Sequence, residues 1–396
     1  MVSLVPFNDA LKIVLAEARP LPAEDVPVTQ AHNRTLAKPI LARIASPRVD
    51  SSAMDGYAVR DQDVGRLPAK LRVRGESFAG TARPPAIIPG EAVRIFTGAP
   101  VPDGADRVVV QENCTRVDDM VEVREYGTAR HIRPAGLDFE EGAELLTAGA
   151  RLTPRALVAA AGADIAVVSA VRRPRVAILG TGDELVPPGE ARQRPGTIPE
   201  SISPAIAAMI VEAGGEVVQR VHLPDEVAVL ADWARDALVE ADLVVVTGGA
   251  SVGERDYAKA MFGEMLDLLF SKVAIKPGKP VWFGRLGPSL VLGLPGNPTS
   301  ALVTARLFLV PLVSGLAGRS PASALNWQGG IAGAPFPANG SRETLERAKW
   351  VGGRLVRLKS QDSSSQTMLA NADVLVRREV GAPEVLPGET VRYLDF

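Results

Sequence analysis

The stretch Ala241–Asp256, ADLVVVTGGASVGERD, decides the fold of the central part of this chain. Its consecutive apolar or β-branched residues, Leu243–Thr247, are typical of a strand that is buried on both faces, as in a parallel sheet. Glycines follow directly, and glycine lets a ligand approach the backbone closely. A buried strand that ends in such a loop, followed by charged residues, marks a ligand site in an open α/β sheet. A tight turn into a helix explains this stretch alone equally well.

Predicted strands and helices alternate around this stretch, from residue 172 to residue 318. Further strands are expected at 174–180, 216–223, 272–278, 281–286 and 289–296, and helices at 204–212, 226–240, 258–270 and 298–315. Alternation of this kind predicts a mainly parallel sheet with helices on both faces. The fold class is therefore multidomain α/β plus β, with this α/β domain at its centre.

The flanking regions differ in texture from the α/β region. Residues 46–138 consist of short alternating runs with glycine and proline between them, which predicts an inserted β-rich domain. Residues 1–45 and 139–171 are expected to form one discontinuous helical N-terminal domain, with helices at 10–19 and 29–36 and a third that begins after Thr153. Residues 319–396 are expected to form a C-terminal β domain.

Composition limits the classes of function. The formal net charge of -2 argues against nucleic-acid binding driven by bulk charge. The single cysteine, Cys114, excludes an intrachain disulfide, and the scattered His32, His131 and His222 make a zinc site improbable. No apolar run approaches the roughly 20 residues of a membrane span, and the N-terminus lacks the features of a signal peptide. We therefore expect a cytoplasmic protein with no nucleic-acid or membrane partner.

Loops at the carboxyl ends of predicted parallel strands should meet at one edge of the sheet. They are GTGDEL (Gly180–Leu185), TGGASVGERD (Thr247–Asp256) and LPGNPTS (Leu294–Ser300), and AIKPGKP (Ala274–Pro280) lies nearby in the sequence. Their backbone amides and lysines suit an oxyanion or phosphate, whereas their carboxylates suit a hard divalent cation such as Mg²⁺. Groups that bind an anion and carboxylates that repel it lie in the same loops, which indicates a phosphate-bearing ligand that binds together with a metal ion. Ordinary surface turns remain the alternative for any one loop.

The motifs closely resemble those of one known family. They are SAMDGYAV (Ser52–Val59), RIFTGAPVP (Arg94–Pro102), TGDEL, TGGASVGERDY, AIKPGKP and LPGNP, in this order. The chain resembles the molybdopterin molybdenumtransferases, which comprise the MoeA proteins and the gephyrin E-domain, from about residue 7 to its C-terminal domain. The resemblance implies molybdenum cofactor biosynthesis: adenylylated molybdopterin and molybdate are substrates, Mg²⁺ is the cofactor, and AMP is released. It also implies an elongated homodimer of four-domain subunits with an active cleft shared between both subunits.

The resemblance implies roles for residues at matching motif positions. The implied catalytic residues are Asp55, Thr97, Asp183, Glu184, Asp256, Lys276 and Lys279. The implied substrate-binding residues are Gly180, Thr181, Gly182, Gly248, Gly249, Ser251, Gly253, Pro295, Gly296, Asn297, Pro298 and Ser363. The implied metal ligands are Asp55, Asp138, Glu184, Asp225 and Asp256. Carboxylate-bound Mg²⁺ neutralises a pyrophosphate, and lysines stabilise developing charge or hold molybdate.

Two positions depart from the family pattern. Ile202 stands where an amide is common, and isoleucine can make no side-chain hydrogen bond. Ser364 stands where a histidine is common. These departures leave open a non-catalytic protein that binds or carries the pterin, and a different phosphate-ester enzyme is a weaker alternative. The protein partners that the resemblance implies are the molybdopterin adenylyltransferase and apo-molybdoenzymes.

Overall fold

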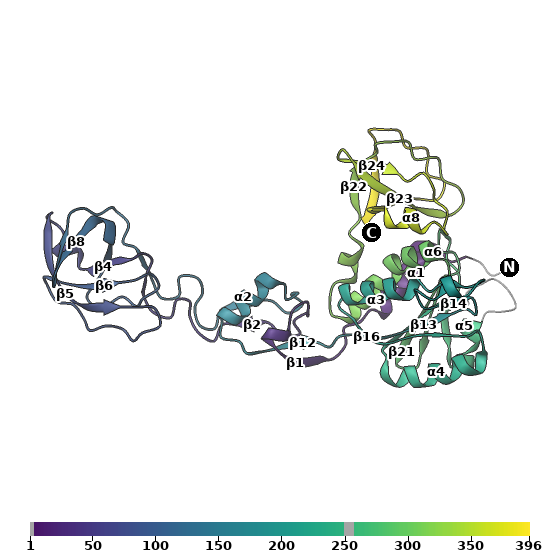
Figure 1. Ribbon diagram of the computed structural model, residues 1–396, viewed down its shortest axis with the longest axis horizontal. Coiled ribbons are helices and arrows are strands. Elements are labelled where there is room, and N and C mark those ends of the chain that lie inside the picture. The colour runs from purple at the N-terminus through teal and green to yellow at the C-terminus, as the bar shows by residue number, and fades with distance from the viewer. Residues whose placement is uncertain (1–3, 249–256) are drawn as a thin grey trace.

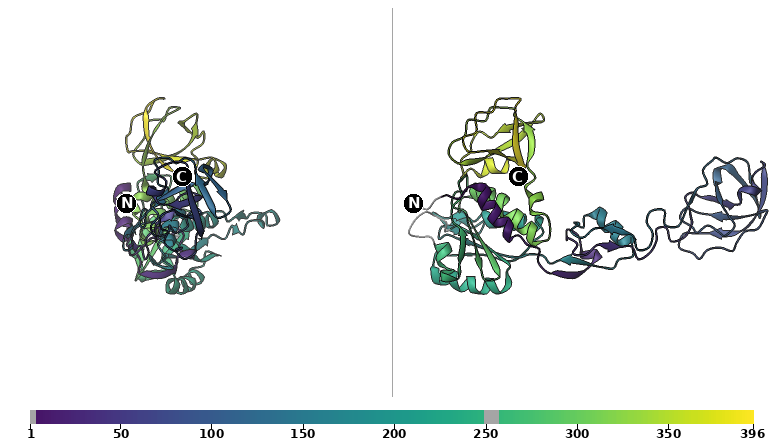
Figure 2. Two further views of the ribbon diagram at one scale, coloured as in Figure 1. Left: turned by 90° about the vertical axis from the view of Figure 1, so that its left-hand side faces the viewer. Right: turned by 180° about the vertical axis from the view of Figure 1, so that it is seen from behind.

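The computed structural model describes residues 4–248 and 257–396 and is elongated (Figure 1). A β-rich domain forms one end of the molecule, and a small mixed domain lies in the middle. The α/β domain and the C-terminal β domain lie against each other at the other end, and the view from behind shows the same arrangement (Figure 2). The multidomain architecture with an α/β domain between the other domains in sequence agrees with the expectation, although this domain lies at one end of the molecule.

The α/β domain contains a sheet with the strand order β16-β13-β17-β21-β20-β18. Its strands are β13 (Arg175–Thr181), β16 (Glu216–Leu223), β17 (Leu243–Thr247), β18 (Asp267–Phe270), β20 (Trp282–Leu286) and β21 (Ser289–Leu294). The pairs of β13 with β16, β13 with β17, and β17 with β21 are parallel, whereas β20 and β18 add an antiparallel edge. The sheet is therefore mixed, and its parallel part contains the central strand.

Helices cover both faces of this sheet. Its helices are α1 (Phe7–Glu17), α3 (Ile202–Glu212), α4 (Val227–Glu240), α5 (Tyr257–Ala260), α6 (Pro298–Thr304) and α7 (Val310–Leu316), with a π-helical turn at Ala305–Leu309. Leu243 and Val245 of β17 enter the core under α1, α3, α6 and α7, whereas Val244 and Val246 enter the core under α4. Successive side chains of a strand point to opposite faces. This explains why the central strand is apolar without interruption.

Two predicted elements of this domain are wrong in part. A helix was expected at 258–270, but α5 ends at Ala260 and the last four residues of this segment form strand β18. β18 pairs with β20, and this tertiary pairing overrides the local helical pattern. The expected strand at 272–278 is limited to β19 (Ile275–Lys276), which pairs with the C-terminal domain rather than with the α/β sheet.

The predicted N-terminal domain does join residues from both expected segments, but it is not mainly helical and it does not contain the first helix. Helix α1 packs on α7 of the α/β domain, where Phe7 and Val14 enter the core. The middle domain instead pairs β1 (Ala23–Pro27) with β12 (Val167–Val171), and β2 (Ile40–Leu41) with β11 (Glu144–Leu146). Its one α-helix among the described residues is α2 (Pro154–Gly162), capped by Thr153, and the helix expected at 29–36 is only a 3₁₀ turn at Val28–Gln30. The apolar face of α1 is thus buried in the α/β core, and burial of apolar surface favours this packing.

The two β domains each contain one large sheet. The β-rich domain has the order β7-β4-β6-β5-β9-β8, with β4 (Gly56–Val59), β5 (Ala69–Ser77), β6 (Glu91–Ile95), β7 (Arg107–Val110), β8 (Cys114–Val117) and β9 (Met120–Val123). The C-terminal domain has the order β19-β23-β25-β26-β22, with β22 (Gln328–Ile331), β23 (Glu343–Val351), β25 (Val374–Arg378) and β26 (Thr390–Asp395), and β24 (Arg354–Arg357) also pairs with β23. Short elements complete the chain: β3 (Ser51–Ser52), β10 (Ile132–Arg133), β14 (Leu185–Val186), β15 (Ile198–Pro199) and α8 (Gln366–Ala370).

One helical segment, Pro298–Leu316, is apolar and long enough to cross a membrane. Within the protein, 83% of its most apolar window is buried. Its residues Val303, Leu307 and Phe308 belong to the core of the α/β domain. The apolar character of this helix is therefore explained by burial in the fold.

Candidate functional site

The loops after β13, β17 and β21 meet at the carboxyl edge of the sheet. A Cβ atom added to Gly248 would lie 2.4 Å from the carbonyl oxygen of Thr181, and one added to Gly296 would lie 3.3 Å from the Cα of Gly248. Gly248 also has a φ of 92°, which residues with side chains rarely adopt. The three loops therefore touch through their backbones, and glycine is required at the point of contact.

An acidic cluster forms beside these loops. The backbone N–H of Asp225 donates to Oδ1 of Asp183 at 3.0 Å, and the His222 ring is 2.9 Å from the Gly182 carbonyl oxygen. The carboxylate of Glu184 lies over Gly182, where an added Cβ would be 3.0 Å from Glu184 Oε2. Burial raises the pKa of Asp225, and the charges of Asp183 and Glu184 raise it further, whereas the neighbouring Thr181 hydroxyl and His222 ring lower it. A cation at this cluster would relieve this repulsion.

Three polar atoms near the loop junction are buried and have no hydrogen-bond partner among the described residues. They are Thr181 Oγ1, Asp225 Oδ1 and Asn297 Oδ1. Buried polar side-chain atoms are nearly always satisfied, because an unmade hydrogen bond costs about 1–3 kcal/mol. Thr181 is the last residue of β13 and Asn297 precedes α6, so the unsatisfied atoms come from different segments that converge. A polar ligand or a metal ion between these loops would satisfy them.

The helix that follows the acidic loop is capped by a buried glutamate. Glu200 is 7% exposed; its Oε1 accepts from the backbone N–H groups of Ile202 and Ser203, and its Oε2 accepts from the Ser203 hydroxyl. The Ile202 side chain is 7% exposed and packs in the core. The Ile202 side chain is therefore directed into the core, where it makes no hydrogen bond.

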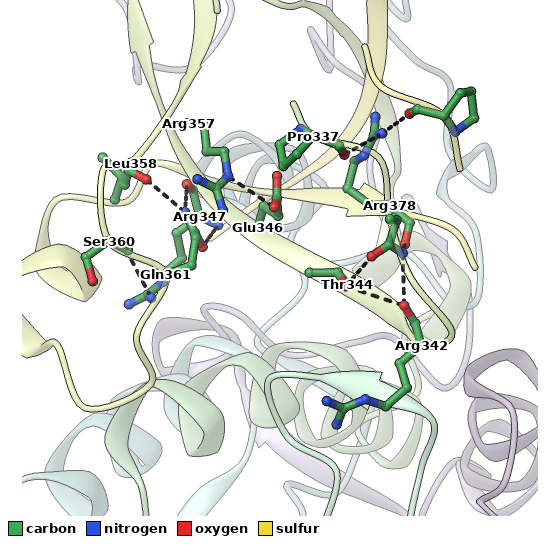
Figure 3. Close-up of polar contacts among 12 residues, drawn as sticks. Pro337, Arg342, Thr344, Glu346, Arg347, Arg357, Leu358, Ser360, Gln361 and Arg378 are labelled. Atoms are coloured by element: carbon green, nitrogen blue, oxygen red, sulfur yellow. Dashed lines mark hydrogen bonds and ion pairs between the residues drawn. The ribbon is translucent and has the colours of Figure 1, made fainter. Parts of the chain in front are cut away.

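A basic segment lies where the α/β domain meets the C-terminal domain. β19 pairs in parallel with β23, so that Lys276 lies opposite Thr344. Lys276 is exposed and Lys279 is half-buried. Arg342 directly precedes β23, and its side chain extends away from the sheet toward the α/β domain (Figure 3). Sequence reasoning missed Arg342, because only the pairing of β19 with β23 brings it near Lys276.

The loop 360–365 of the C-terminal domain contacts the start of α6. The carbonyl oxygen of Ser363 accepts from the Thr299 N–H at 3.3 Å, next to the LPGNP motif. Arg347 is 1% exposed and donates to Thr299 Oγ1 at 3.2 Å and to the Asp362 carbonyl at 2.8 Å. Figure 3 shows Arg347 beside Gln361, whose side-chain amide exchanges two hydrogen bonds with the Arg347 backbone. Arg347, which the sequence analysis did not identify, therefore links loop 360–365 to the start of α6.

Asp55, Thr97 and Asp138 lie away from these loops. Asp55 Oδ1 accepts from the Thr97 N–H at 2.7 Å and from the Thr97 hydroxyl at 2.8 Å, and these bonds lower the pKa of Asp55. Asp55 and Thr97 belong to the β-rich domain, which lies at the end of the molecule opposite the α/β domain (Figure 1). Asp138 is exposed beside the connection between the β-rich and middle domains. Within one chain, these residues and the α/β loops are separate.

The expected metal ligands are accordingly not brought together in one chain. Glu184 and Asp225 are neighbours, Asp55 and Asp138 are remote, and Asp256 lies outside the described residues together with Gly249, Ser251 and Gly253. Within residues 4–248 and 257–396, no group of three or more histidine, cysteine or acidic side chains is placed to hold a metal ion. The acids around Asp225 still fit part of a site for a hard cation, since an unpartnered carboxylate oxygen faces like charges there.

Comparisons with known proteins cover almost the whole chain. Residues 5–163 match the family described as MoeA N-terminal region (domain I and II), residues 177–315 match a probable molybdopterin binding domain, and residues 330–396 match the MoeA C-terminal region (domain IV). The molybdopterin molybdenumtransferase of Haemophilus influenzae is 39% identical over 315 residues, which are 78% of each chain. That of Bacillus subtilis is 30% identical over 403 residues, covering 98% of this chain and 94% of the relative. A crystal structure of the molybdopterin biosynthesis MoeA protein from Pyrococcus horikoshii superposes with a TM-score of 0.82 at 29% identity, covering 99% of this chain and 98% of that chain.

Proposed function

The chain belongs to the MoeA family of molybdopterin molybdenumtransferases, enzymes of molybdenum cofactor biosynthesis, and we propose that it inserts molybdate into adenylylated molybdopterin with Mg²⁺ and releases AMP. The observation that carries this proposal is the junction of the three strand-end loops. Thr181, Asp225 and Asn297 each present a buried polar atom that has no hydrogen-bond partner among residues 4–248 and 257–396, and two further carboxylates lie beside them. This combination suits a phosphate-bearing ligand with a metal ion.

The acids and the basic groups have separate roles in this proposal. Glu184 and Asp225 would contribute to the Mg²⁺ site, with Asp183 holding the Asp225 backbone N–H, and the ion would neutralise the phosphate charge and polarise the phosphorus. Lys276 and Lys279 would hold the molybdate dianion, with Arg342 contributing a further positive charge. The reaction then depends on positioning and electrostatics, and no covalent protein nucleophile is needed.

We further propose that the functional unit is a homodimer with a shared cleft, located in the cytoplasm. Asp55 and Thr97 match family motifs, but their β-rich domain lies at the opposite end of the molecule from the α/β loops. A second copy would bring its β-rich domain to these loops and complete the set of acids. Light scattering at micromolar concentration tests the dimer, and a monomer would contradict it. The molybdopterin adenylyltransferase and apo-molybdoenzymes remain proposed protein partners.

The direct test is AMP release from adenylylated molybdopterin in the presence of molybdate and Mg²⁺. We expect release by the full-length protein, loss of release when Mg²⁺ is removed by a chelator, and strong impairment in Asp225→Asn. Asp232→Asn is the matched control, because Asp232 is an exposed acid on α4 that pairs with Arg235. Binding of the substrate without AMP release when both ions are present would refute the enzyme and favour the carrier.

One observation favours the carrier as the second candidate. Ser364 occupies the position where the family commonly has a histidine, and its hydroxyl donates to Asp362 Oδ1 at 2.6 Å. This bond and that of the Ser364 N–H lower the pKa of Asp362, so the serine is used within its own loop. A carrier would retain pterin binding in Asp55→Ala, and this substitution would change no measured activity.

A further inference from the structure

Two aromatic rings form an exposed stack in the β-rich domain. The Phe78 and Phe96 rings lie 4.6 Å apart between centroids at an interplanar angle of 11°. Phe78 nevertheless remains 45% exposed. The Arg94 guanidinium lies 4.7 Å from the Phe96 ring centroid and donates to the Gly56 carbonyl at 2.9 Å, which fixes the base of the stack. The domain thus presents a rigid aromatic surface to solvent rather than burying it.

The strand register places this stack beside the Asp55–Thr97 pair. In the antiparallel pair of β4 and β6, Gly56 lies opposite Ile95, so Asp55 and Phe96 flank the same end of the sheet. In the parallel pair of β5 and β6, Ser77 lies opposite Ile95, which brings Phe78 to that end as well. These strands are neighbours in the β-rich domain (Figure 1). The aromatic stack therefore adjoins the acid that the sequence motif singled out.

A cavity of about 940 Å³ continues from the same loops. Its lining includes Thr81, Gly98, Arg48, Arg83, Arg133 and Asp138. Arg83 is paired with Asp103, whereas the side chains of Arg48 and Arg133 have no hydrogen bond or ion pair with any residue in the described parts of the chain. Two free guanidinium groups against one exposed carboxylate leave the cavity with an excess of positive charge. Guanidinium groups bind phosphate in a bidentate geometry.

We propose that this surface, formed by Phe78 with Arg48 and Arg133, is a binding subsite for a planar heteroaromatic ring that carries a phosphate. The ring stacks on the exposed face of Phe78, and the two arginines bind the phosphate in the adjoining cavity. This inference rests on the proposed function, whose substrate contains two such groups, an adenine nucleotide and a pterin with a phosphate. The subsite holds one of them next to the Asp55–Thr97 pair.

The test is calorimetric titration of the full-length protein with four probes: AMP, adenosine, ribose 5-phosphate and an oxidised pterin monophosphate. We expect tighter binding of a probe that has both ring and phosphate than of adenosine or ribose 5-phosphate. Phe78→Ala should lower the affinity for that probe by about tenfold, as is usual for loss of one stacking partner. Arg48→Ala should lower the affinity for the phosphate-bearing probes and leave the affinity for adenosine unchanged. The preferred probe, AMP or the pterin, identifies which half of the substrate is held.

Matched controls come from the opposite end of the same sheet. Val117 is 64% exposed on β8, and Arg72 is an exposed arginine on β5 paired with Asp119. Val117→Ala and Arg72→Ala should bind every probe as the unsubstituted protein does. Equal affinities of Phe78→Ala and Val117→Ala for AMP and the pterin would overturn the subsite. Weaker probe binding in Phe78→Ala without any AMP release by the unsubstituted protein would support the subsite while refuting the transferase.

Discussion

Removal of the buried Arg347 guanidinium should detach loop 360–365 from the start of α6. Arg347 donates to the Asp362 carbonyl at 2.8 Å and to Thr299 Oγ1 at 3.2 Å, and two longer contacts reach the carbonyls of Ser360 and Ser365. Hydrogen bonds from a charged donor contribute about 1.5–3 kcal/mol each, so the two short bonds sum to roughly 3–6 kcal/mol. Burial lowers the pKa of Arg347, which shows that the buried charge itself is costly and offsets part of this gain.

We therefore expect Arg347→Met to destabilise the protein by about 3 kcal/mol. In a cooperative unit of about 150–250 residues this corresponds to a fall in Tm of roughly 6–12 °C, measured by scanning calorimetry. The loop places Ser363 against Thr299, so the KM for adenylylated molybdopterin should rise at temperatures where the variant is still folded. Arg354→Met is the control, because Arg354 is an exposed arginine on the neighbouring strand β24.

Two outcomes would refute this reasoning. A fall in Tm of less than about 2 °C would show that the buried guanidinium contributes little net stability. A large fall in Tm with an unchanged KM would show that the loop around Ser363 does not contact the substrate. The expected combination is a changed Tm and a changed KM in Arg347→Met, and neither change in Arg354→Met.

Three further outcomes follow from individual side chains. Thr97→Val removes one of the two bonds that lower the pKa of Asp55, so this pKa should rise, as measured by carboxyl ¹³C NMR, and an unchanged titration would contradict the geometry. The pKa of Asp225 is raised in the folded state, so its contribution to stability is fully present below the unfolded-state pKa and is lost as the pH rises through the folded-state pKa. Asp225→Asn should therefore raise Tm more at pH 7 than at pH 4. Mg²⁺ should raise Tm in the unsubstituted protein and leave the Tm of Asp225→Asn unchanged. Burial raises the pKa of Cys114 to about 11, so alkylation by iodoacetamide at pH 8 should be roughly 100-fold slower than in the urea-unfolded chain, and equal rates would contradict this burial.

The sequence predicted the α/β domain well because strong local patterns agree with its tertiary structure. Leu243–Thr247 is apolar without interruption, and both faces of β17 are buried. The loops after β13, β17 and β21 were expected to meet because they leave parallel strands at the same edge, and the close approach of Gly248 to Thr181 and of Gly296 to Gly248 shows that they do. The α/β domain could be predicted because the spacing of its apolar residues matches the burial of its strands.

The failures occurred where a distant segment decides the local structure. The segment 258–270 has a helical pattern, yet its last four residues become β18 because β20 offers a pairing edge. Helix α1 was assigned to a separate domain, but its apolar face is buried in the α/β core. Local spacing cannot show which of several apolar surfaces a helix will cover.

By itself, the sequence determined the α/β core, the glycine-rich loops and the family motifs, because each is encoded in adjacent residues. Only the tertiary structure decided that Ile202 faces the core, that Arg347 secures loop 360–365, and that Arg342 approaches Lys276 through the pairing of β19 with β23. The same is true of the buried side-chain oxygens of Thr181, Asp225 and Asn297, which have no hydrogen-bond partner in the part of the chain that the structure describes. The physical reason is that burial, hydrogen bonding and the pKa of a side chain depend on neighbours that are distant in the chain.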